Sequence, residues 1–181
     1  RMSKKKKTAN PNSEHYVNND ELVSDILSYK ANVLFSEENG NPKPQMGDAL
    51  GEKILRIATR LSLSPNFRGY TYRDEMVSDG VENCLLYITN FDPNKSNNAF
   101  AYLTQIIYFA FLRRIYKEKR QQYIKLVAFE QKGIFGLFQD LDRTKFEKQL
   151  TEKQKELGLT NADLEKFKPK PRKKSKKRKK L

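Results

Sequence analysis

The chain has 181 residues, of which 37% are hydrophobic and 32% are charged, so it suits one domain of ordinary size with polar tails. No apolar run approaches the ~18 residues of a membrane-spanning helix, and we expect no membrane partner. Lys4–Lys7 lead into polar residues rather than the apolar core of a signal peptide. Cys84 and His15 are the only residues of their kinds, which excludes an internal disulfide and a Cys/His zinc site.

The formal net charge of +14 is concentrated at the two ends of the chain. Residues 1–7 hold five Lys or Arg and residues 166–181 hold eleven, with no acid in either run. The remaining 20 basic and 22 acidic residues lie between 8 and 165, where the net charge is −2. The folded part is therefore not basic as a whole, and affinity for nucleic acid must come from a local patch or from the tails.

Two helices are predicted in the first third of the chain. Asp20 is a residue type that caps helices, and a series at helical spacing follows it: Leu22, Ile26, Tyr29 and Val33. Gly40 and two prolines predict a loop over 37–46. A second helix is predicted from Asp48, ending before Ser64, with an apolar face formed by Ile54, Ile57, Ala58 and Leu61.

A third helix and a longer fourth helix are predicted next. Thr71 and Asp74 form a capping-box pattern before the third helix. Its apolar side consists of Met76, Val77, Val81, Cys84, Leu85 and Ile88. The turn 91–94 separates it from a fourth helix, which opens near Asn97 or Asn98. The first half of that helix, 100–112, is apolar almost all round, which is typical of a central core helix. Its second half, 113–125, is basic.

The rest of the chain predicts less structure. Phe146, Leu150 and Leu157 indicate a weak later helix, and prolines among like charges predict an unpacked tail from Lys166 onward. No segment shows the period-two alternation of a strand, so the predicted class is all-α. We expect four segments: a disordered basic arm (1–15), a helical domain (16–125), a partly helical extension (126–165) and a disordered Lys/Arg-rich tail (166–181).

Two stretches, taken together, resemble conserved region 2 of the sigma-70 family of bacterial transcription initiation factors. Glu75–Gly80, followed by Phe91-Asp92, is similar to the family's acidic–Leu–Ile–Gln–Glu–Gly helix and its Lys-Phe-Asp-type turn. Phe100–Thr104, leading to Arg113-Arg114, is similar to the Phe-Ser-Thr-Tyr-Ala helix that ends in basic residues. The resemblance implies a compact helical bundle like sigma region 2.

More narrowly, the chain resembles the late-transcription sigma factors of T-even-type phages. Five motifs occur in the same order: Tyr16–Asn19, Gly69–Thr71, Glu75–Gly80, Asn90–Asp92 and Ala101–Gln105. Gln105 and Ile106 stand where housekeeping factors have two tryptophans. Phe109 and Leu112 replace the polar residues that would read the upstream edge of the promoter element.

The resemblance implies two sets of binding residues. Ser78, Asp79, Glu82 and Asn83 would bind the clamp coiled coil of the β′ subunit of bacterial RNA polymerase core. The expected DNA-binding residues are Tyr102 and Gln105 at an unpaired base, and Arg113, Arg114, Lys117 and Arg120 at phosphates. From the residues alone, charges on a helix are more often a solvated face, and a tyrosine in an apolar helix is often core. Cys84 has the spacing of a small buried residue.

The function that the resemblance implies is that of a phage late-transcription sigma factor. Such a protein binds host polymerase core in the cytoplasm of the infected cell, directs it to −10-like, A/T-rich late promoters and assists promoter opening. No phosphate-binding loop, dinucleotide fingerprint or metal cluster is present, so we expect neither an enzyme nor a cofactor. Two alternatives stay open: a helical nucleic-acid-binding protein with a basic tail, and an interaction adaptor without a role on DNA.

Late factors of this family also work with a sliding clamp and a phage coactivator. They bind the clamp through an acidic and apolar peptide at the C-terminus, whereas the C-terminus here is basic. The only peptide of suitable chemistry is 131–138, in which Gln131, Ile134, Leu137 and Phe138 are the candidate contacts. The alternative interpretation is that its apolar side chains fold back over the end of the long helix.

Overall fold

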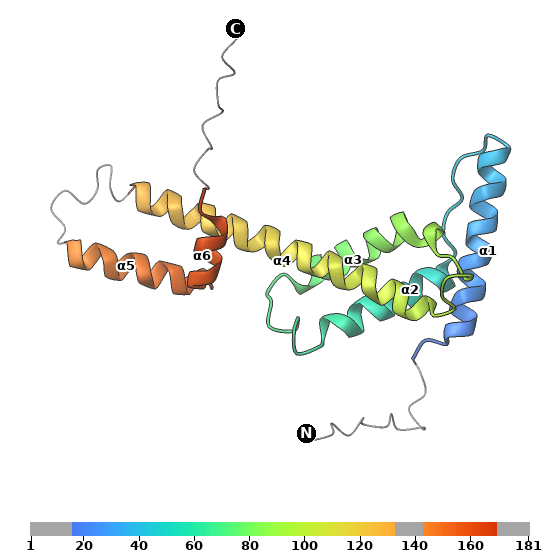
Figure 1. Cartoon of the computed structure of the whole chain (residues 1–181), viewed down its shortest axis with the longest axis horizontal. Coiled ribbons are helices and arrows are strands. Elements are labelled where there is room, and N and C mark those ends of the chain that lie inside the picture. The colour runs from blue at the N-terminus through green and yellow to red at the C-terminus, as the bar shows by residue number, and fades with distance from the viewer. Residues whose placement is uncertain (1–15, 133–142, 170–181) are drawn as a thin grey trace, which may run out of the picture. The chain divides into compact units, whose positions relative to one another are not determined.

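The computed structural model describes residues 16–132 and 143–169, and over these ranges it confirms the predicted all-α class (Figure 1). The described residues contain no strand, and none of their helices has an apolar stretch long enough to cross a membrane. The helices are α1 (Asn19–Glu38), α2 (Asp48–Ser62), α3 (Arg73–Tyr87), the 3₁₀ helix η1 (Ile88–Asn90), α4 (Ala99–Lys132), α5 (Arg143–Glu156) and α6 (Asn161–Phe167).

The chain forms two compact units, Arg1–Arg114 and Ile115–Leu181, which we call unit 1 and unit 2. Unit 1 contains α1 to α3, η1 and the first half of α4. Unit 2 contains the rest of α4 with α5 and α6. The domain boundary predicted after residue 125 lies within unit 2. The expected arm 1–15 and most of the expected tail lie outside the described residues.

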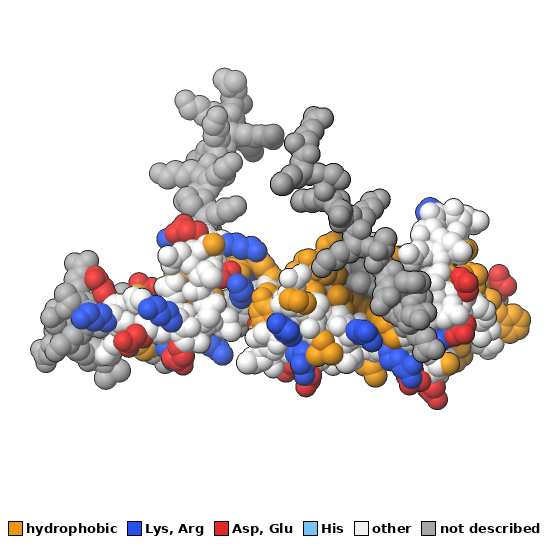
Figure 2. Space-filling model, turned by 90° about the horizontal axis from the view of Figure 1, so that it is seen from below, with side chains coloured by type: hydrophobic (Ala, Val, Ile, Leu, Met, Phe, Trp, Pro, Cys, Tyr) orange, Lys and Arg blue, Asp and Glu red, His pale blue; other side chains and the backbone are white. Residues whose placement is uncertain are grey.

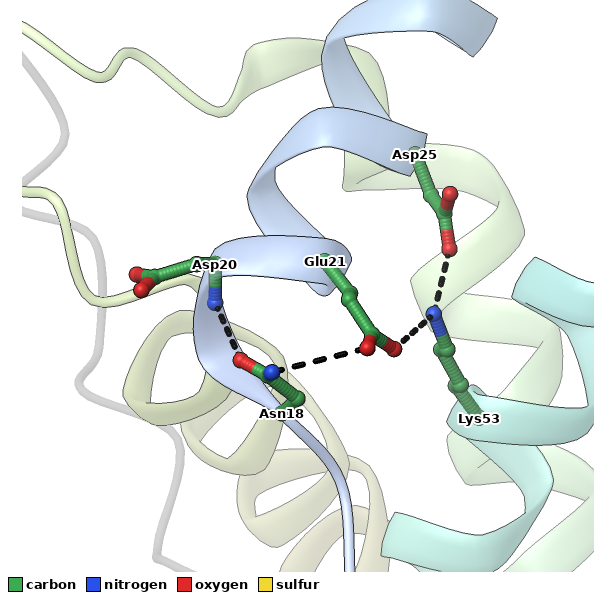
Figure 3. A network of polar contacts seen from close by, with 5 residues as sticks. All are labelled: Asn18, Asp20, Glu21, Asp25 and Lys53. Carbon is green, nitrogen blue, oxygen red and sulfur yellow. Dashed lines mark hydrogen bonds and ion pairs between the residues drawn. The ribbon is translucent and has the colours of Figure 1, made fainter.

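Helix α1 begins two residues earlier than Asp20 would predict. The side chain of Asn18 accepts a hydrogen bond from the backbone N–H of Asp20 at 3.0 Å, so Asn18 is the N-cap and Asp20 lies in the first turn. The predicted apolar series is correct, because Leu22, Ile26, Tyr29 and Val33 are all buried. Lys53 of α2 donates to Asp25 at 2.7 Å and to Glu21 at 3.3 Å, which joins α2 to the first turns of α1 (Figure 3).

The capping box predicted before α3 does not form. The N-cap of α3 is Tyr72, which makes no side-chain capping bond, and Thr71 lies one residue too early to cap a helix that begins at Arg73. At α4 the prediction is confirmed, since the Asn98 side chain accepts from the backbone N–H of Ala101 at 2.8 Å. In the segment that connects α2 to α3, Phe67 is buried and packs edge-on against Phe111, with 5.1 Å between ring centroids.

Helices α3 and α4 approach closely at Gly80. A Cβ atom placed on Gly80 would lie 3.0 Å from the Ile107 Cγ2 atom and 3.0 Å from the Phe111 Cε1 atom, so a larger residue at this position would require these side chains to shift. Around this point Met76, Cys84, Leu103, Ile107 and Phe111 are fully buried. Cys84 is therefore a core residue, as predicted, and burial raises the pKa of its thiol to about 12. The first half of α4 is central to the core, although Tyr108, Phe109 and Leu112 remain exposed.

In unit 2, α5 runs back along α4 and is followed by a short α6 (Figure 1). Gly158 ends α5 in the left-handed conformation, with φ of 65°, while its N–H donates to the carbonyl of Lys155 at 2.9 Å. Leu126 and Leu159 are buried. The tail predicted from Lys166 begins too early, because Lys166 and Phe167 belong to α6. Phe167 packs against Tyr116 and Tyr123, and a Lys-rich composition gives no sign of such an aromatic contact.

The first prediction concerns the close approach at Gly80. Gly80→Ala should lower the free energy of unfolding by about 1–3 kcal/mol, because the added methyl group forces Ile107 and Phe111 out of their packed positions. Gly51→Ala in α2 is the matched control, since a Cβ at Gly51 meets no atom within 4 Å. That variant should gain about 0.5–1 kcal/mol from helix propensity. Chemical denaturation measures both, and equal effects at the two positions would contradict the packing account.

Candidate polymerase and nucleic-acid interface

The four residues expected to bind polymerase divide between two sides of α3. Ser78 and Glu82 are exposed and lie one helical turn apart. The Ser78 hydroxyl donates to the carbonyl of Asp74 within its own helix at 3.0 Å. Leu85, which is 39% exposed, and Leu86, which is 60% exposed, continue the same side toward the end of α3. The accessible strip of α3 is therefore polar at Ser78 and Glu82 and apolar at Leu85 and Leu86, and we call it the α3 strip.

Asp79 and Asn83 instead face α4. The Arg114 guanidinium donates from Nε and from one terminal nitrogen to the two Asp79 carboxylate oxygens, each at 2.6 Å. Arg113 donates to the Asn83 side-chain oxygen at 2.6 Å, and Asn83 donates in turn to the backbone carbonyl of Asp79 at 2.7 Å. A bidentate contact between an arginine and a carboxylate is both strong and geometrically specific. Asp79 and Asn83, which were expected to contact polymerase, are therefore bonded to Arg114 and Arg113, which were expected to contact phosphates.

The sequence did not predict this pairing, because Asp79 and Asn83 were expected to bind polymerase and the two arginines to bind phosphates. Asp79 and Arg114 are 35 residues apart, and both side chains are largely buried, with 26% and 18% exposed. Arg114 consequently has a structural role in joining α3 to α4. Arg113 is exposed in spite of its bond to Asn83, so it remains accessible to a ligand.

Tyr102, the candidate stacking residue, is partly buried beside Phe91. The two ring centroids lie 5.4 Å apart, and the Tyr102 hydroxyl donates to the backbone carbonyl of Tyr87 at 2.7 Å. Burial raises the pKa of this hydroxyl. The ring contact with Phe91 and the hydroxyl hydrogen bond to Tyr87 hold the Tyr102 ring in one orientation. A core residue and a preformed stacking surface would both require such a fixed ring. Gln105 is exposed one turn further along α4.

A hollow lined by amide side chains opens where α1 and α4 begin, and we call it the amide hollow. It is lined by Val17, Asn18, Asn19, Asp20, Ser96, Asn97, Asn98 and Phe100. Asn19 connects its two sides, because its amide donates to the Asn97 carbonyl at 2.9 Å and its oxygen accepts from the Phe100 N–H at 3.2 Å. The Phe100 ring meets Tyr16 edge-on, with 5.7 Å between centroids.

The sequence did not predict this hollow, although it contains one signal of it. Asn18-Asn19 and Asn97-Asn98 are the two Asn-Asn pairs that precede predicted helices, and each pair supplies an N-cap. A cap is expected at any helix start, so the pairs alone do not predict that two starts will meet. Lys53 binds Asp25 and Glu21, and the other Glu21 carboxylate oxygen lies 3.5 Å from the Asn18 amide nitrogen, so this network reaches one residue of the hollow (Figure 3).

The face of unit 1 seen in Figure 2 carries many hydrophobic side chains. On α4, Phe109 is 48% exposed and Leu112 is 40% exposed, next to Tyr108. The face of unit 2 seen in Figure 2 shows fewer hydrophobic side chains, and Lys, Arg, Asp and Glu side chains are scattered over it. Exposed apolar side chains that gather on one unit are typical of a protein that binds a partner.

The remaining candidate residues lie in unit 2 or outside the described ranges. Lys117 and Arg120 are exposed on α4, three residues apart. Gln131 is exposed near the end of the same helix. Ile134, Leu137 and Phe138 lie outside the described residues. No group of His, Cys, Asp or Glu side chains within 16–132 and 143–169 is suited to hold a metal ion.

No protein-family model matches the chain, and a search of curated proteins gives no significant match.

The second prediction tests the contact between α3 and α4. Asp79→Ala and Arg114→Ala should each destabilise unit 1, with a coupling energy of about 1–3 kcal/mol in a double-mutant cycle, because the two side chains share two charge-assisted hydrogen bonds. Lys117→Gln and Arg120→Gln serve as controls and should change stability by less than about 0.5 kcal/mol, since both side chains are exposed. A coupling energy near zero would mean that Asp79 does not hold Arg114, which would then be available to bind phosphate.

Proposed function

We propose that this protein is a sigma-type transcription initiation factor of the phage late class. It binds bacterial RNA polymerase core in the cytoplasm of the infected cell and directs it to −10-like, A/T-rich promoters. The protein supplies binding surfaces rather than catalysis. The proposal rests on the resemblance of the two motif-bearing helices, α3 and α4, together with the surfaces that these helices present in unit 1.

The observation that carries the proposal is the amide hollow beside Phe100. Asparagine side chains both donate and accept hydrogen bonds, so they suit the edge of an unpaired base. An aromatic ring beside them offers a surface on which that base can stack. The described part of unit 1 has 10 basic and 12 acidic residues, so its affinity for DNA cannot depend on net charge. Recognition by amides and stacking is consistent with such a balance.

The α3 strip is the proposed polymerase contact. It combines an acidic residue, Glu82, with exposed leucines, a composition that suits a partner helix carrying basic and apolar residues. Asp79 and Asn83 support this strip from behind through their bonds to α4. In this proposal they act by holding α3 in place, and Ser78 and Glu82 make the direct contact.

One observation favours a second candidate function. Unit 2 contains 21 basic and 9 acidic residues, a net charge of +12 out of +14. A nucleic-acid-binding protein with no polymerase partner would also show this concentration of charge. Binding to purified core polymerase separates the two candidates.

The third prediction addresses polymerase binding. Glu82→Lys should weaken binding to bacterial core polymerase by about tenfold or more at physiological salt, because it places a cation against a basic partner surface. Glu37→Lys on α1 makes the same change of charge at another exposed site and should have little effect. Surface plasmon resonance with immobilised core measures both. Equal affinities of the wild-type protein and Glu82→Lys would contradict the docking surface, and no binding by the wild type would contradict the function.

The fourth prediction addresses the amide hollow. Phe100→Leu and Asn97→Ala should each reduce promoter opening by about fivefold or more, since one loses a stacking surface and the other a hydrogen-bonding amide. Permanganate reactivity of promoter thymines, with core polymerase present, reports the open bubble. Asn94→Ala, in the turn before α4 but outside the hollow, is the control. Core binding should not change in any of the three variants, and normal thymine reactivity in the first two would exclude the hollow from base capture.

A further inference from the structure

Helix α6 is anchored to α4 by aromatic contacts. The ring centroid of Phe167 lies 5.2 Å from that of Tyr116 and 5.9 Å from that of Tyr123. The Lys166 ammonium group lies 4.8 Å from the centre of the Tyr116 ring, within the range of a cation–π contact. A helix of seven residues is too short to be stable alone in water. Its stability therefore depends on this packing.

An ion pair fixes the other end of α6. Lys119 of α4 donates to the Asp163 carboxylate at 2.8 Å, and Asp163 also accepts from the backbone N–H of Thr160 at 3.1 Å in a capping box. Burial opposes the ionisation of Asp163, but the bonds from Lys119 and Thr160 outweigh it and lower its pKa. Tyr116, Lys119 and Tyr123 lie on one face of α4, so α6 covers a continuous strip of that helix.

The position of α6 determines where the most basic segment of the chain begins. Residues 168–181 contain ten Lys or Arg and no acid, and this C-terminal cationic run starts immediately after Phe167. On the adjoining face of α4, Lys117 and Arg120 are exposed. Docking of α6 thus brings the start of the run to the part of α4 that carries these two cations.

We propose that unit 2 is a module that binds duplex DNA without reading its sequence, and that α6 is its anchor. The C-terminal cationic run and the two exposed α4 cations bind phosphates along the same stretch of duplex, because α6 fixes the origin of the run beside them. The choice of DNA as the partner rests on the proposed function. Joining two weak binding elements raises the effective concentration of the second, and this gain falls as the connection between them lengthens.

If α6 is an anchor, Asp163→Ala should change DNA affinity in the direction opposite to the one expected from net charge alone. Asp163→Ala removes a negative charge, so electrostatics alone would tighten binding to DNA. It also breaks the pair with Lys119 and the capping box, which releases α6. If α6 is the anchor, the variant should bind DNA more weakly although its net charge is higher by one.

The experiment measures binding of the full chain to a fluorescent duplex of about 30 base pairs without a promoter-like sequence, at 50–200 mM salt and with no polymerase. Asp163→Ala should weaken binding about threefold to tenfold. Glu152→Ala, which removes an exposed acid of α5, is matched in charge and should tighten binding slightly. Phe167→Ala leaves the charge unchanged and should weaken binding to a similar extent, whereas Phe167→Tyr keeps the ring and should bind as the wild type does.

Two results would overturn the proposal. If Asp163→Ala and Glu152→Ala tighten binding equally, charge alone governs affinity and α6 is no anchor. If Phe167→Ala binds more tightly than the wild type, α6 covers a binding face of α4 instead of assisting it. Circular dichroism and thermal unfolding of each variant show whether the loss is confined to α6 or extends to the rest of unit 2. Should a variant unfold more widely, Lys117→Gln with Arg120→Gln tests the same surface, and unchanged affinity and salt dependence in that variant would also overturn the proposal.

This test is independent of the one for polymerase binding. A protein that binds core polymerase but shows no dependence of DNA affinity on α6 would retain the proposed function and lose the anchor. A protein that does not bind polymerase but loses DNA affinity with Asp163→Ala would keep the anchor and favour the second candidate function.

Discussion

The close approach of α3 and α4 at Gly80 is the contact on which the rest of unit 1 depends. Because Gly80 has no Cβ, Ile107 and Phe111 reach the backbone of α3, and the two helices come close enough for side chains to bond across them. Asp79 and Asn83, on either side of this contact in sequence, then bind Arg114 and Arg113. Packing at a glycine therefore determines which charged residues are used within the fold and which remain for partners.

That distribution changes the functional interpretation of the basic segment that follows the apolar half of α4. Six basic residues between 113 and 125 resemble a single phosphate-binding stripe in the sequence. In the structure Arg114 is used by Asp79 and Lys119 by Asp163, and both of these ion pairs are largely shielded from water. Lys117 and Arg120 remain exposed in unit 2. The density of charge in a sequence thus overestimates the number of cations that a ligand can reach.

The sequence predicted the helices better than it predicted their partners. Apolar spacing correctly identified the buried side of α1, most of the buried side of α2, and the presence of the long α4. The spacing of apolar residues within one helix is enough to predict which side is buried. It did not identify the N-cap of α3, the buried Phe67 or the end of α6 at Phe167. Each of these depends on residues far away in the chain. Of the candidate site, Ser78 and Glu82 are exposed and their binding role stays a prediction. The pairing of Asp79 with Arg114 could not be predicted, because it depends on how two helices pack together.

The proposed function divides two kinds of nucleic-acid recognition between the two units. A strongly cationic surface binds any duplex, and its affinity falls steeply as salt rises, whereas stacking and amide contacts depend much less on salt. The described part of unit 1 has more acidic than basic residues and carries the amide hollow. Unit 2 contains nearly all of the net charge. In the proposed function, attraction to DNA without sequence preference therefore varies with ionic strength, while the proposed base contacts of unit 1 stay nearly constant, because the residues responsible belong to different units.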